Sequence, residues 1–220
     1  MGLPFWDMPD RLVIEGCAYP INTDFRVGIR LRQMFWDPYY TAHPSQLIDG
    51  IVYLLFSGMV PHRSWECALI GPVLWYLLDG RVSLTKIMRR LGDRAGEPAA
   101  SRFAAAASES TEPVFSYLWD TPALYAAFRA EYGLDLLTEH MHLWQFDALF
   151  SALSADCALC RTMAIRASVI DDTADPAFRA SLAAQKAAVR IPGTEELHAL
   201  QEQRLQQEQH LMPGSTADGS

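Results

Sequence analysis

The stretch from Phe115 to Leu153 constrains the fold of this chain more than any other. It concentrates aromatic side chains in two segments with helical spacing that meet at Gly133. Glycine is typical of a helix C-terminus, because it enters the left-handed conformation without strain. Thr121 followed by Pro122 favours a helix start, since proline is preferred at the first helical position. We therefore expect two packed helices here, and no recognisable catalytic motif accompanies them.

The second of these expected helices carries two apolar stripes. Leu143, Phe146, Phe150 and Leu153 form one stripe, Met141, Trp144, Ala148 and Ala152 form the other, and Asp147 and Ser151 lie between them. A helix with two apolar sides either lies between two neighbours or buries one side and offers the other to a partner. The aromatic residues that we expect to anchor the core or a partner interface are Trp144, Phe146, Tyr125 and Phe128. Aromatic side chains are enriched in both settings, so both roles stay open.

The remaining pattern predicts a small β-hairpin followed by helices. Two short β-compatible pieces flank Glu15-Gly16 within Arg11–Ile21, and Pro20 belongs at the end of the hairpin because it cannot donate to a ladder. Four further helices are expected in the first part of the chain: from Phe25 to before Pro38 (capped by Asn22, Thr23 or Asp24), from His43 to Met59, from His62 to Leu78 with an interruption near Gly71-Pro72, and over Leu84–Leu91. Two more are expected near the C-terminus: Ala155–Arg166, capped by Ser154, and Pro176–Val189, charged at its start by Asp171, Asp172 and Asp175. The predicted fold class is mainly α, a multi-helical bundle with a small N-terminal β-hairpin.

Composition divides the chain into segments. Residues 92–113 are small, polar and bounded by proline, which predicts a flexible linker. This linker separates an N-terminal hairpin and helical unit at 1–91 from a C-terminal helical unit at 114–192. Residues 193–220 are rich in Gln and Glu and are expected to form a partly disordered tail.

Charge and hydropathy limit the classes of partner. Residues 1–91 carry nine Lys and Arg against eight Asp and Glu, whereas residues 92–220 carry nine against eighteen. The net charge of −8 therefore arises in the second half, and this negative charge argues against nucleic acid as a partner. The arginines of the first half (Arg26, Arg30, Arg32, Arg89 and Arg90) are typical of solvated helix faces. The apolar runs Ile51–Val60 and Cys67–Leu78 are shorter than the roughly 20 residues that span a bilayer. The N-terminus lacks the plan of a signal peptide, so we expect a soluble cytoplasmic protein without a membrane partner.

Few patterns point to chemistry. Cys157-x-x-Cys160 has metal or redox spacing, but it lacks a second ligand pair and a βαβ context, so buried thiols are expected. His140 and His142 would diverge on a helix, which is how we interpret this segment. The sequence contains no HExxH, GxSxG or phosphate-binding glycine loop. We expect neither a cofactor nor enzyme activity, with a thiol or metal-dependent enzyme as the less favoured alternative.

Three segments, taken in order, resemble one phage family. They are YPINTDFR at 19–26, MHLWQF at 141–146 and MAIR at 163–166. The family is the siphophage "gene-product fifteen" type, and the resemblance covers about residues 11–190. Leu143 departs from the family, which has a tryptophan there, and Gln145 stands where a basic residue is usual.

The resemblance implies a role in building the phage tail. Members of this family are regarded as tail assembly chaperones, which bind the tape-measure protein and assist assembly of the tail tube. The implied partners are therefore the tape-measure protein and, as a second candidate, the tail-tube protein, in the host cytoplasm during phage assembly. Whether the chain forms a homo-oligomer stays open. The alternative is a structural tail or connector component of the virion.

Overall fold

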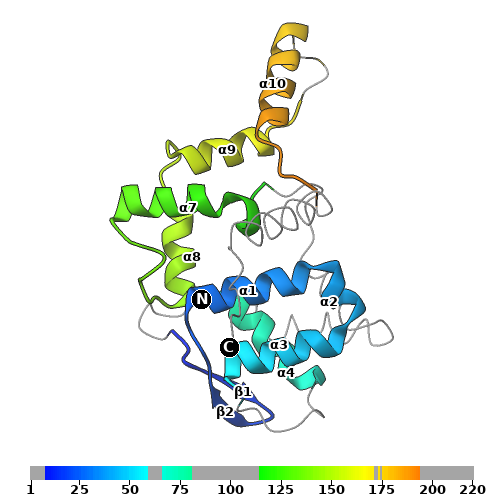
Figure 1. The fold of residues 1–220 in the computed structure, drawn as a ribbon, viewed down its shortest axis with the longest axis vertical. Helices are drawn as coiled ribbons and strands as arrows, with labels where there is room; N and C mark the ends of the chain where they lie inside the picture. The colour runs from blue at the N-terminus through cyan, green and yellow to red at the C-terminus, as the bar shows by residue number, and fades with distance from the viewer. Residues whose placement is uncertain (1–7, 59–65, 81–113, 171–172, 174, 194–220) are drawn as a thin grey trace, which may run out of the picture. The chain divides into compact units, whose positions relative to one another are not determined.

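The computed structural model describes residues 8–58, 66–80, 114–170, 173 and 175–193 (Figure 1). The chain is mainly α-helical with a two-stranded antiparallel hairpin, which confirms the predicted fold class. It divides into two compact units: unit 1 comprises 1–112 and 122–160, and unit 2 comprises 113–121 and 161–220. Three predicted segments lie outside the described residues: the linker at 92–113, the helix Leu84–Leu91 and the tail beyond residue 193. The division at 92–113 stays a prediction.

The predicted hairpin opens unit 1. Strands β1 (Arg11–Ile14) and β2 (Cys17–Pro20) pair antiparallel, from Arg11 opposite Pro20 to Ile14 opposite Cys17. Glu15 and Gly16 both have positive φ (48° and 82°), as a two-residue turn that matches the twist of the strands requires. Leu12 and Ile14 point inward and are buried, and β1 packs against α4 (Glu66–Leu77).

Three helices follow the hairpin in unit 1 (Figure 1). Helix α1 (Phe25–Trp36) begins where predicted, since the Asp24 side chain accepts a hydrogen bond from the Arg26 N–H. The sequence analysis missed the short helix α2 (Pro38–Ala42), in which Pro38 occupies the first turn and Asp37 is the cap. Helix α3 (Pro44–Phe56) packs against α1 and ends at Ser57, which is left-handed, earlier than the predicted end at Met59.

The predicted interruption near Gly71-Pro72 is wrong, because α4 continues through both residues. Proline inside a helix loses one hydrogen bond and crowds the preceding turn. Here Gly71 and Pro72 are buried, as are Leu69, Ile70 and Val73 beside them. The burial of this apolar segment favours the continuous helix over the local preference of proline.

The predicted start of the next helix at Thr121-Pro122 is also wrong. Helix α7 (Tyr117–Tyr132) begins one turn earlier and contains Pro122. Ser116 precedes this helix: its hydroxyl accepts from the Trp119 N–H, and its own N–H donates to the Asp120 carboxylate at 2.9 Å. This reciprocal arrangement resembles a capping box and satisfies donors that the first turn leaves unpaired. The predicted end is confirmed, since Gly133 has φ 69° and its N–H donates to the Arg129 carbonyl.

Residues 140–142 do not form a helix, contrary to the interpretation of this segment. They run extended beside the N-terminus of α1, and His142 forms an isolated β-bridge with Asp24. Helix α8 begins only after His142 and spans Leu143–Ser151. Two backbone hydrogen bonds form this bridge: the Phe25 N–H donates to the Met141 carbonyl, and the Leu143 N–H donates to the Thr23 carbonyl. These bonds stabilise the extended backbone here, although the side chains have helical spacing.

The last two described helices are α9 (Ala158–Ala167) and α10 (Pro176–Ala188). The predicted cap of α9 at Ser154 is wrong, because Ser154 accepts instead from the Asp156 and Cys157 N–H groups in a turn before the helix. The start of α10 is confirmed, with Asp175 accepting from the Ala177 N–H and Pro176 in the first turn.

Candidate protein-interaction surface

The predicted aromatic anchors lie in unit 1, and two of them are core residues. Phe146 and Phe128 are fully buried, and the Phe146 ring stacks on Phe25 at 4.7 Å and on Phe128 at 5.2 Å between ring centroids. Tyr125 is half-buried. Phe146 thus joins α8 to α1 and to α7, and its side chain is covered by this chain.

Trp144 is half-buried on the other side of α8. Its Nε1–H donates to the Tyr76 carbonyl at 2.8 Å, and its ring meets Trp75 edge-on at 5.4 Å. Helix α8 therefore lies between two neighbours, with the Phe146 side toward α1 and the Trp144 side toward α4. This is one of the two arrangements that its paired stripes allowed.

Close backbone approach at Gly28 helps α8 to reach α1. Gly28 is buried in α1, and a Cβ atom at this position would lie 2.6 Å from the Leu143 side chain. That separation is well inside van der Waals contact, so the contact requires a residue without a side chain. The leucine that departs from the family pattern is thus the residue that packs on Gly28.

A buried ion pair ties the same helices together and was not predicted. Arg32 donates to both Asp147 oxygens at 2.7 and 2.5 Å, twice to the Leu77 carbonyl at 2.9 and 2.6 Å, and to Asp79 at 3.2 Å. Arg32 was expected on a solvated helix face, but its side chain and that of Asp147 are both largely buried. A guanidinium tolerates burial when its donors are satisfied, as they are here. Because 115 positions separate the partners, no local pattern indicates the pair.

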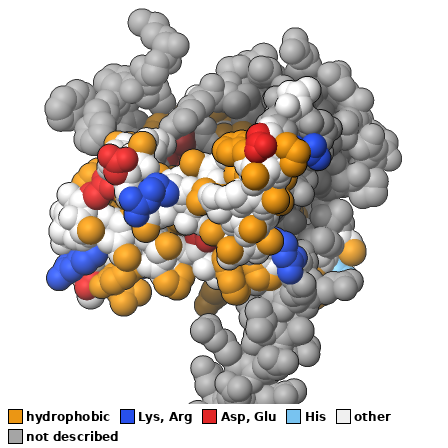
Figure 2. Space-filling view, turned by 90° about the horizontal axis from the view of Figure 1, so that it is seen from above, with side chains coloured by type: hydrophobic (Ala, Val, Ile, Leu, Met, Phe, Trp, Pro, Cys, Tyr) orange, Lys and Arg blue, Asp and Glu red, His pale blue; other side chains and the backbone are white. Residues whose placement is uncertain are grey.

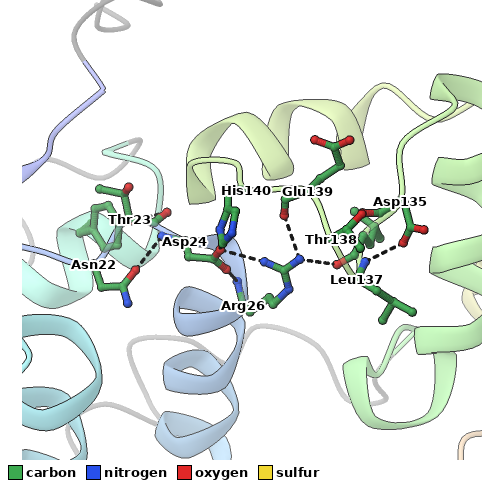
Figure 3. Close-up of polar contacts among 11 residues, drawn as sticks. Asn22, Thr23, Asp24, Arg26, Asp135, Leu137, Thr138, Glu139 and His140 are labelled. Atoms are coloured by element: carbon green, nitrogen blue, oxygen red, sulfur yellow. Dashed lines mark hydrogen bonds and ion pairs between the residues drawn. The ribbon is translucent and has the colours of Figure 1, made fainter.

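A second arginine connects the loop between α7 and α8 to the start of α1 by hydrogen bonds (Figure 3). Arg26 donates to the Leu136 carbonyl at 2.7 Å and to the Glu139 carbonyl at 2.8 Å, and it pairs with Asp24 at 2.8 Å. The same Asp24 carboxylate contacts the His140 ring at 3.1 Å. Arg26 was also expected on a solvated face, whereas its guanidinium holds a loop in place.

His142 joins three segments of unit 1. Its Nδ1 accepts from the Trp144 N–H at 3.0 Å and caps α8, while Nε2 lies 3.1 Å from the Pro9 carbonyl. These contacts fit a neutral imidazole that carries its proton on Nε2. Burial lowers the pKa of His142, and the Pro9 hydrogen bond and the nearby Asp147 charge oppose that change. The two histidines of the His140-x-His142 motif thus have different contacts: His140 with the Asp24 carboxylate, and His142 with backbone groups of Pro9 and Trp144.

The two cysteines of the Cys157-x-x-Cys160 motif lie close together at the start of α9. Cys157 and Cys160 are half-buried free cysteines, and the Cys160 N–H donates to the Cys157 sulfur at 3.3 Å. Burial, followed by the hydrogen bond with Cys157, raises the pKa of Cys160 to about 11. Cys160 is therefore protonated at neutral pH, which disfavours nucleophilic attack.

Two negative findings apply to the part of the chain that the structure describes. Nowhere in it do three or more His, Cys, Asp or Glu side chains gather as metal ligands would. None of its helices has the length and apolar character that crossing a bilayer requires.

Unit 2 is organised around a buried guanidinium. Arg166, from the end of α9, donates to both Asp120 oxygens at 2.7 and 3.0 Å. It also donates to the Val114 carbonyl at 3.1 Å and to the Val189 carbonyl at 2.6 Å. The side chains of Arg166 and Asp120 are only 7% and 6% exposed. One side chain therefore joins the segment before α7, the first turn of α7, and the C-terminus of α10.

Several large apolar side chains of unit 2 are exposed, and the others are only half-buried. Among its described residues, none of the hydrophobic side chains is buried, and α10 buries no residue at all. The large hydrophobic residues exposed in unit 2 are Leu118, Trp119, Val169, Ile170 and Phe178. In the space-filling view, hydrophobic side chains are spread over the visible surface of the described residues, with Lys, Arg, Asp and Glu side chains among them (Figure 2). We take the exposed residues of unit 2 as the candidate interaction surface.

This surface is not where the predicted anchors lie. The sequence analysis favoured the aromatic residues near Trp144 instead. One signal was available: among the residues of α10 only Arg179 and Lys186 are charged, so little of the helix surface is strongly solvated.

One family model matches the chain. The model described as Bacteriophage Gp15 protein covers residues 8–191, which include every described residue except Pro192 and Gly193. Neither the curated proteins nor the solved structures contain a match to this chain.

Proposed function

The chain belongs to the bacteriophage Gp15 protein family, and from this membership we propose that it is a non-enzymatic tail assembly chaperone. It binds the tape-measure protein in the host cytoplasm and keeps that long helical chain available while the tail tube assembles around it. The tail-tube protein is a second candidate partner. Neither nucleic acid nor a membrane takes part.

The observation that carries this proposal is the outward placement of apolar side chains in unit 2. Phe178 is 60% exposed and Val169 is 85% exposed, although Arg166 holds the segments around them in defined positions. Exposed apolar side chains on an ordered frame are typical of a surface that a partner covers. A frame fixed in advance also lowers the entropy that binding must overcome.

The physical task suits such a surface. A long amphipathic helix exposes an apolar stripe in water until a partner covers it, and that stripe promotes aggregation. A helix can bind by laying its stripe on another apolar face, with anchors at helical spacing. Small contact areas of this kind give modest affinity, so the growing tube is able to displace the chaperone.

The direct test is co-expression of the full chain with the tape-measure protein, followed by affinity capture of the tagged chain. We expect capture of the tape-measure protein and an increase in its soluble fraction. The variant Phe178→Ser/Val169→Ser should reduce capture by about tenfold or more, because exposed anchors dominate interface energies. Failure to capture any segment of the tape-measure protein would contradict the proposal.

A matched control comes from unit 1. Tyr53 on α3 and Val13 on β1 are exposed to a similar degree, at 75% and 60%. The variant Tyr53→Ser/Val13→Ser removes comparable apolar surface and should leave capture unchanged. Purified virions separate a chaperone from a structural component, since a chaperone is absent from the mature tail and a structural protein is present in fixed copy number.

A further inference from the structure

Two cysteines lie where a turn of unit 1 enters helix α9. Cys157 immediately precedes α9, and its sulfur accepts from the Cys160 N–H at 3.3 Å, as the side chain of a capping residue does. The Cys160 thiol also forms a hydrogen bond with the Cys157 thiol. Both cysteines are free, and both belong to unit 1. The two sulfur atoms are therefore neighbours in the folded chain without a covalent bond between them.

The backbone that carries these thiols is held on both sides. Near the end of α7, the Glu131 carboxylate accepts from the Ser154 N–H at 2.9 and 3.2 Å. The Cys157 N–H donates to the Ser154 carbonyl at 3.0 Å. Leu153 before the turn and Leu159 between the cysteines are both buried. Because folding has already ordered this segment, little chain entropy is lost when the two sulfur atoms bond to each other.

The local backbone suits a bond between the two sulfur atoms. A disulfide requires Cβ atoms about 3.5–4.5 Å apart, closer than the ~5–6 Å between side chains three positions apart within a helix. Cys157 precedes Ala158, the first residue of α9, so its backbone is not limited to the helical conformation and the shorter separation is accessible. Asp156 and Ala158 on either side are exposed, which leaves the half-buried Cys157 accessible to a small molecule.

The environment of Cys160 favours a disulfide over a pair of thiolates. Burial, followed by the hydrogen bond with Cys157, raises the pKa of Cys160 to about 11. A dithiol becomes a strong oxidant when its reduced form is stabilised, as it is by a thiolate of low pKa. The reduced form gains no such stabilisation at Cys160, so the disulfide resists reduction more than in a strongly oxidising pair.

We propose that Cys157 and Cys160 form a redox-sensitive site, which a small-molecule disulfide such as oxidised glutathione converts into an intramolecular disulfide. Cys157 loses its proton to solvent and attacks one sulfur of oxidised glutathione, so a Cys157–glutathione bond forms and one glutathione thiolate leaves. Cys160 then loses its proton and attacks the Cys157 sulfur, which releases the second glutathione thiolate. Two protein thiols are oxidised, and oxidised glutathione is reduced to two thiols that take up the two protons. This inference does not depend on the proposed function.

The test incubates the full chain with oxidised and reduced glutathione at several ratios and then blocks the remaining thiols with iodoacetamide. Trypsin cleavage after Arg129 and Arg161 places both cysteines in one peptide, 130–161, without a third cysteine. As the oxidised share rises, mass spectrometry should show this peptide without alkyl groups and lighter by two hydrogens than the free dithiol. Excess reduced glutathione should restore the doubly alkylated peptide. Two alkylated thiols at every ratio, or a glutathione adduct that never resolves, would overturn the proposal.

Single variants test the order of attack. Cys160→Ser lacks the resolving thiol, so one glutathione should remain attached to Cys157 in the same peptide. Cys157→Ser keeps an oxygen that is able to cap α9, so the fold should be kept. Its glutathione adduct at Cys160 should form at least about tenfold more slowly, because Cys160 is protonated at neutral pH. Equal adduct rates in the two variants would overturn the assignment of Cys157 as the attacking thiol.

The matched control is Cys17→Ser. Cys17 is an exposed free thiol on β2, away from the Cys157-x-x-Cys160 motif in sequence. Disulfide formation in peptide 130–161 should be the same in this variant as in the unmodified sequence. Loss of the intramolecular disulfide in Cys17→Ser would mean that Cys17 takes part in the exchange, and it would overturn the proposal that the pair is sufficient.

Discussion

In unit 1 the helices meet through large apolar side chains, whereas in unit 2 they meet through one guanidinium and the oxygen atoms around it. Unit 1 buries, among others, Phe25, Phe128 and Phe146 in one stacked cluster. The described residues of unit 2 bury no hydrophobic side chain, and Arg166 with Asp120 takes the place of a core. Because polar contacts hold unit 2 together, its apolar side chains stay exposed and are able to contact a partner. That difference is why we propose that unit 2 provides the binding surface.

The largest expected effect comes from breaking the core of unit 1. Phe146→Ala removes a fully buried ring between Phe25 and Phe128, so it loses burial and leaves a cavity. We expect a loss of about 3–5 kcal/mol in the free energy of unfolding of unit 1. Urea unfolding, with hydrogen exchange to assign the change to α1, α7 and α8, measures it. The neighbouring exposed Gln145→Ala should change stability by less than about 0.5 kcal/mol. Similar values for the two variants would contradict the assignment of Phe146 to the core.

The next largest effect should come from the frame of unit 2. Asp120→Ala leaves Arg166 buried without its carboxylate, which costs about 3 kcal/mol for a buried pair. Hydrogen exchange should show reduced protection in α10 and the end of α9, because Arg166 also holds the Val189 carbonyl. Protection of the Phe146 cluster in unit 1 should be unchanged. Loss of protection there instead would mean that the two units do not differ as described.

Paired apolar replacements sharpen this comparison. Asp120→Leu/Arg166→Met removes both charges of unit 2, but it leaves the Val114 and Val189 carbonyls without the donor that they now share. Asp147→Leu/Arg32→Met removes both charges of the unit 1 pair, and it leaves the Leu77 carbonyl and Asp79 without the Arg32 donor. Apolar replacement of a buried pair is often tolerated in an apolar setting. We therefore expect each double variant to unfold at a higher urea concentration than the variant that loses the aspartate alone, with the larger recovery in unit 1, whose helices pack through buried apolar side chains.

A smaller effect concerns pH and unit 1 alone. Burial lowers the pKa of His142, so the folded state favours the neutral imidazole that caps α8. The stability that this group contributes is complete above its ordinary pKa of about 6.5 and is lost as the pH falls through the lowered value in the folded state. Unit 1 should therefore unfold more easily at about pH 5 than at about pH 7. His142→Asn keeps a capping group but does not titrate, so its stability should change less over this interval. An equal change would contradict the role of His142.

Local features of the fold were predictable because adjacent residues determine them. Glu15-Gly16 predicts the hairpin turn, Asp24 and Asp175 predict helix starts, and Gly133 predicts a helix end. Each signal acts through hydrogen bonds or φ angles within a few residues. The start at Thr121-Pro122 was wrong because the Ser116–Asp120 capping pair acts one turn earlier and α7 tolerates Pro122.

The pairings between distant segments were not predictable in this way. Arg32 and Asp147 meet across 115 positions, and Arg166 and Asp120 across 46. An arginine on a helix has the same local pattern whether water or a carboxylate satisfies it. The family resemblance includes only some of these contacts. Its three segments contain Asp24, Arg26, His142, Phe146 and Arg166, whereas Arg32, Asp147 and Asp120 lie outside them. The segments that carry the resemblance therefore supply only part of the contacts that hold each unit together.

The smallest expected effect on stability belongs to the residue with the largest expected effect on binding. Phe178 is 60% exposed on a helix that buries no residue, so Phe178→Ser should change the free energy of unfolding by less than about 0.5 kcal/mol. The same substitution, alone, should reduce capture of the tape-measure protein by about tenfold, because a large apolar anchor is lost from the contact. Urea unfolding and affinity capture with one preparation give both values. A clear loss of stability would mean that Phe178 packs within unit 2 and would remove it from the interaction surface. If binding falls while the free energy of unfolding is unchanged, Phe178 contacts a partner and does not maintain the fold.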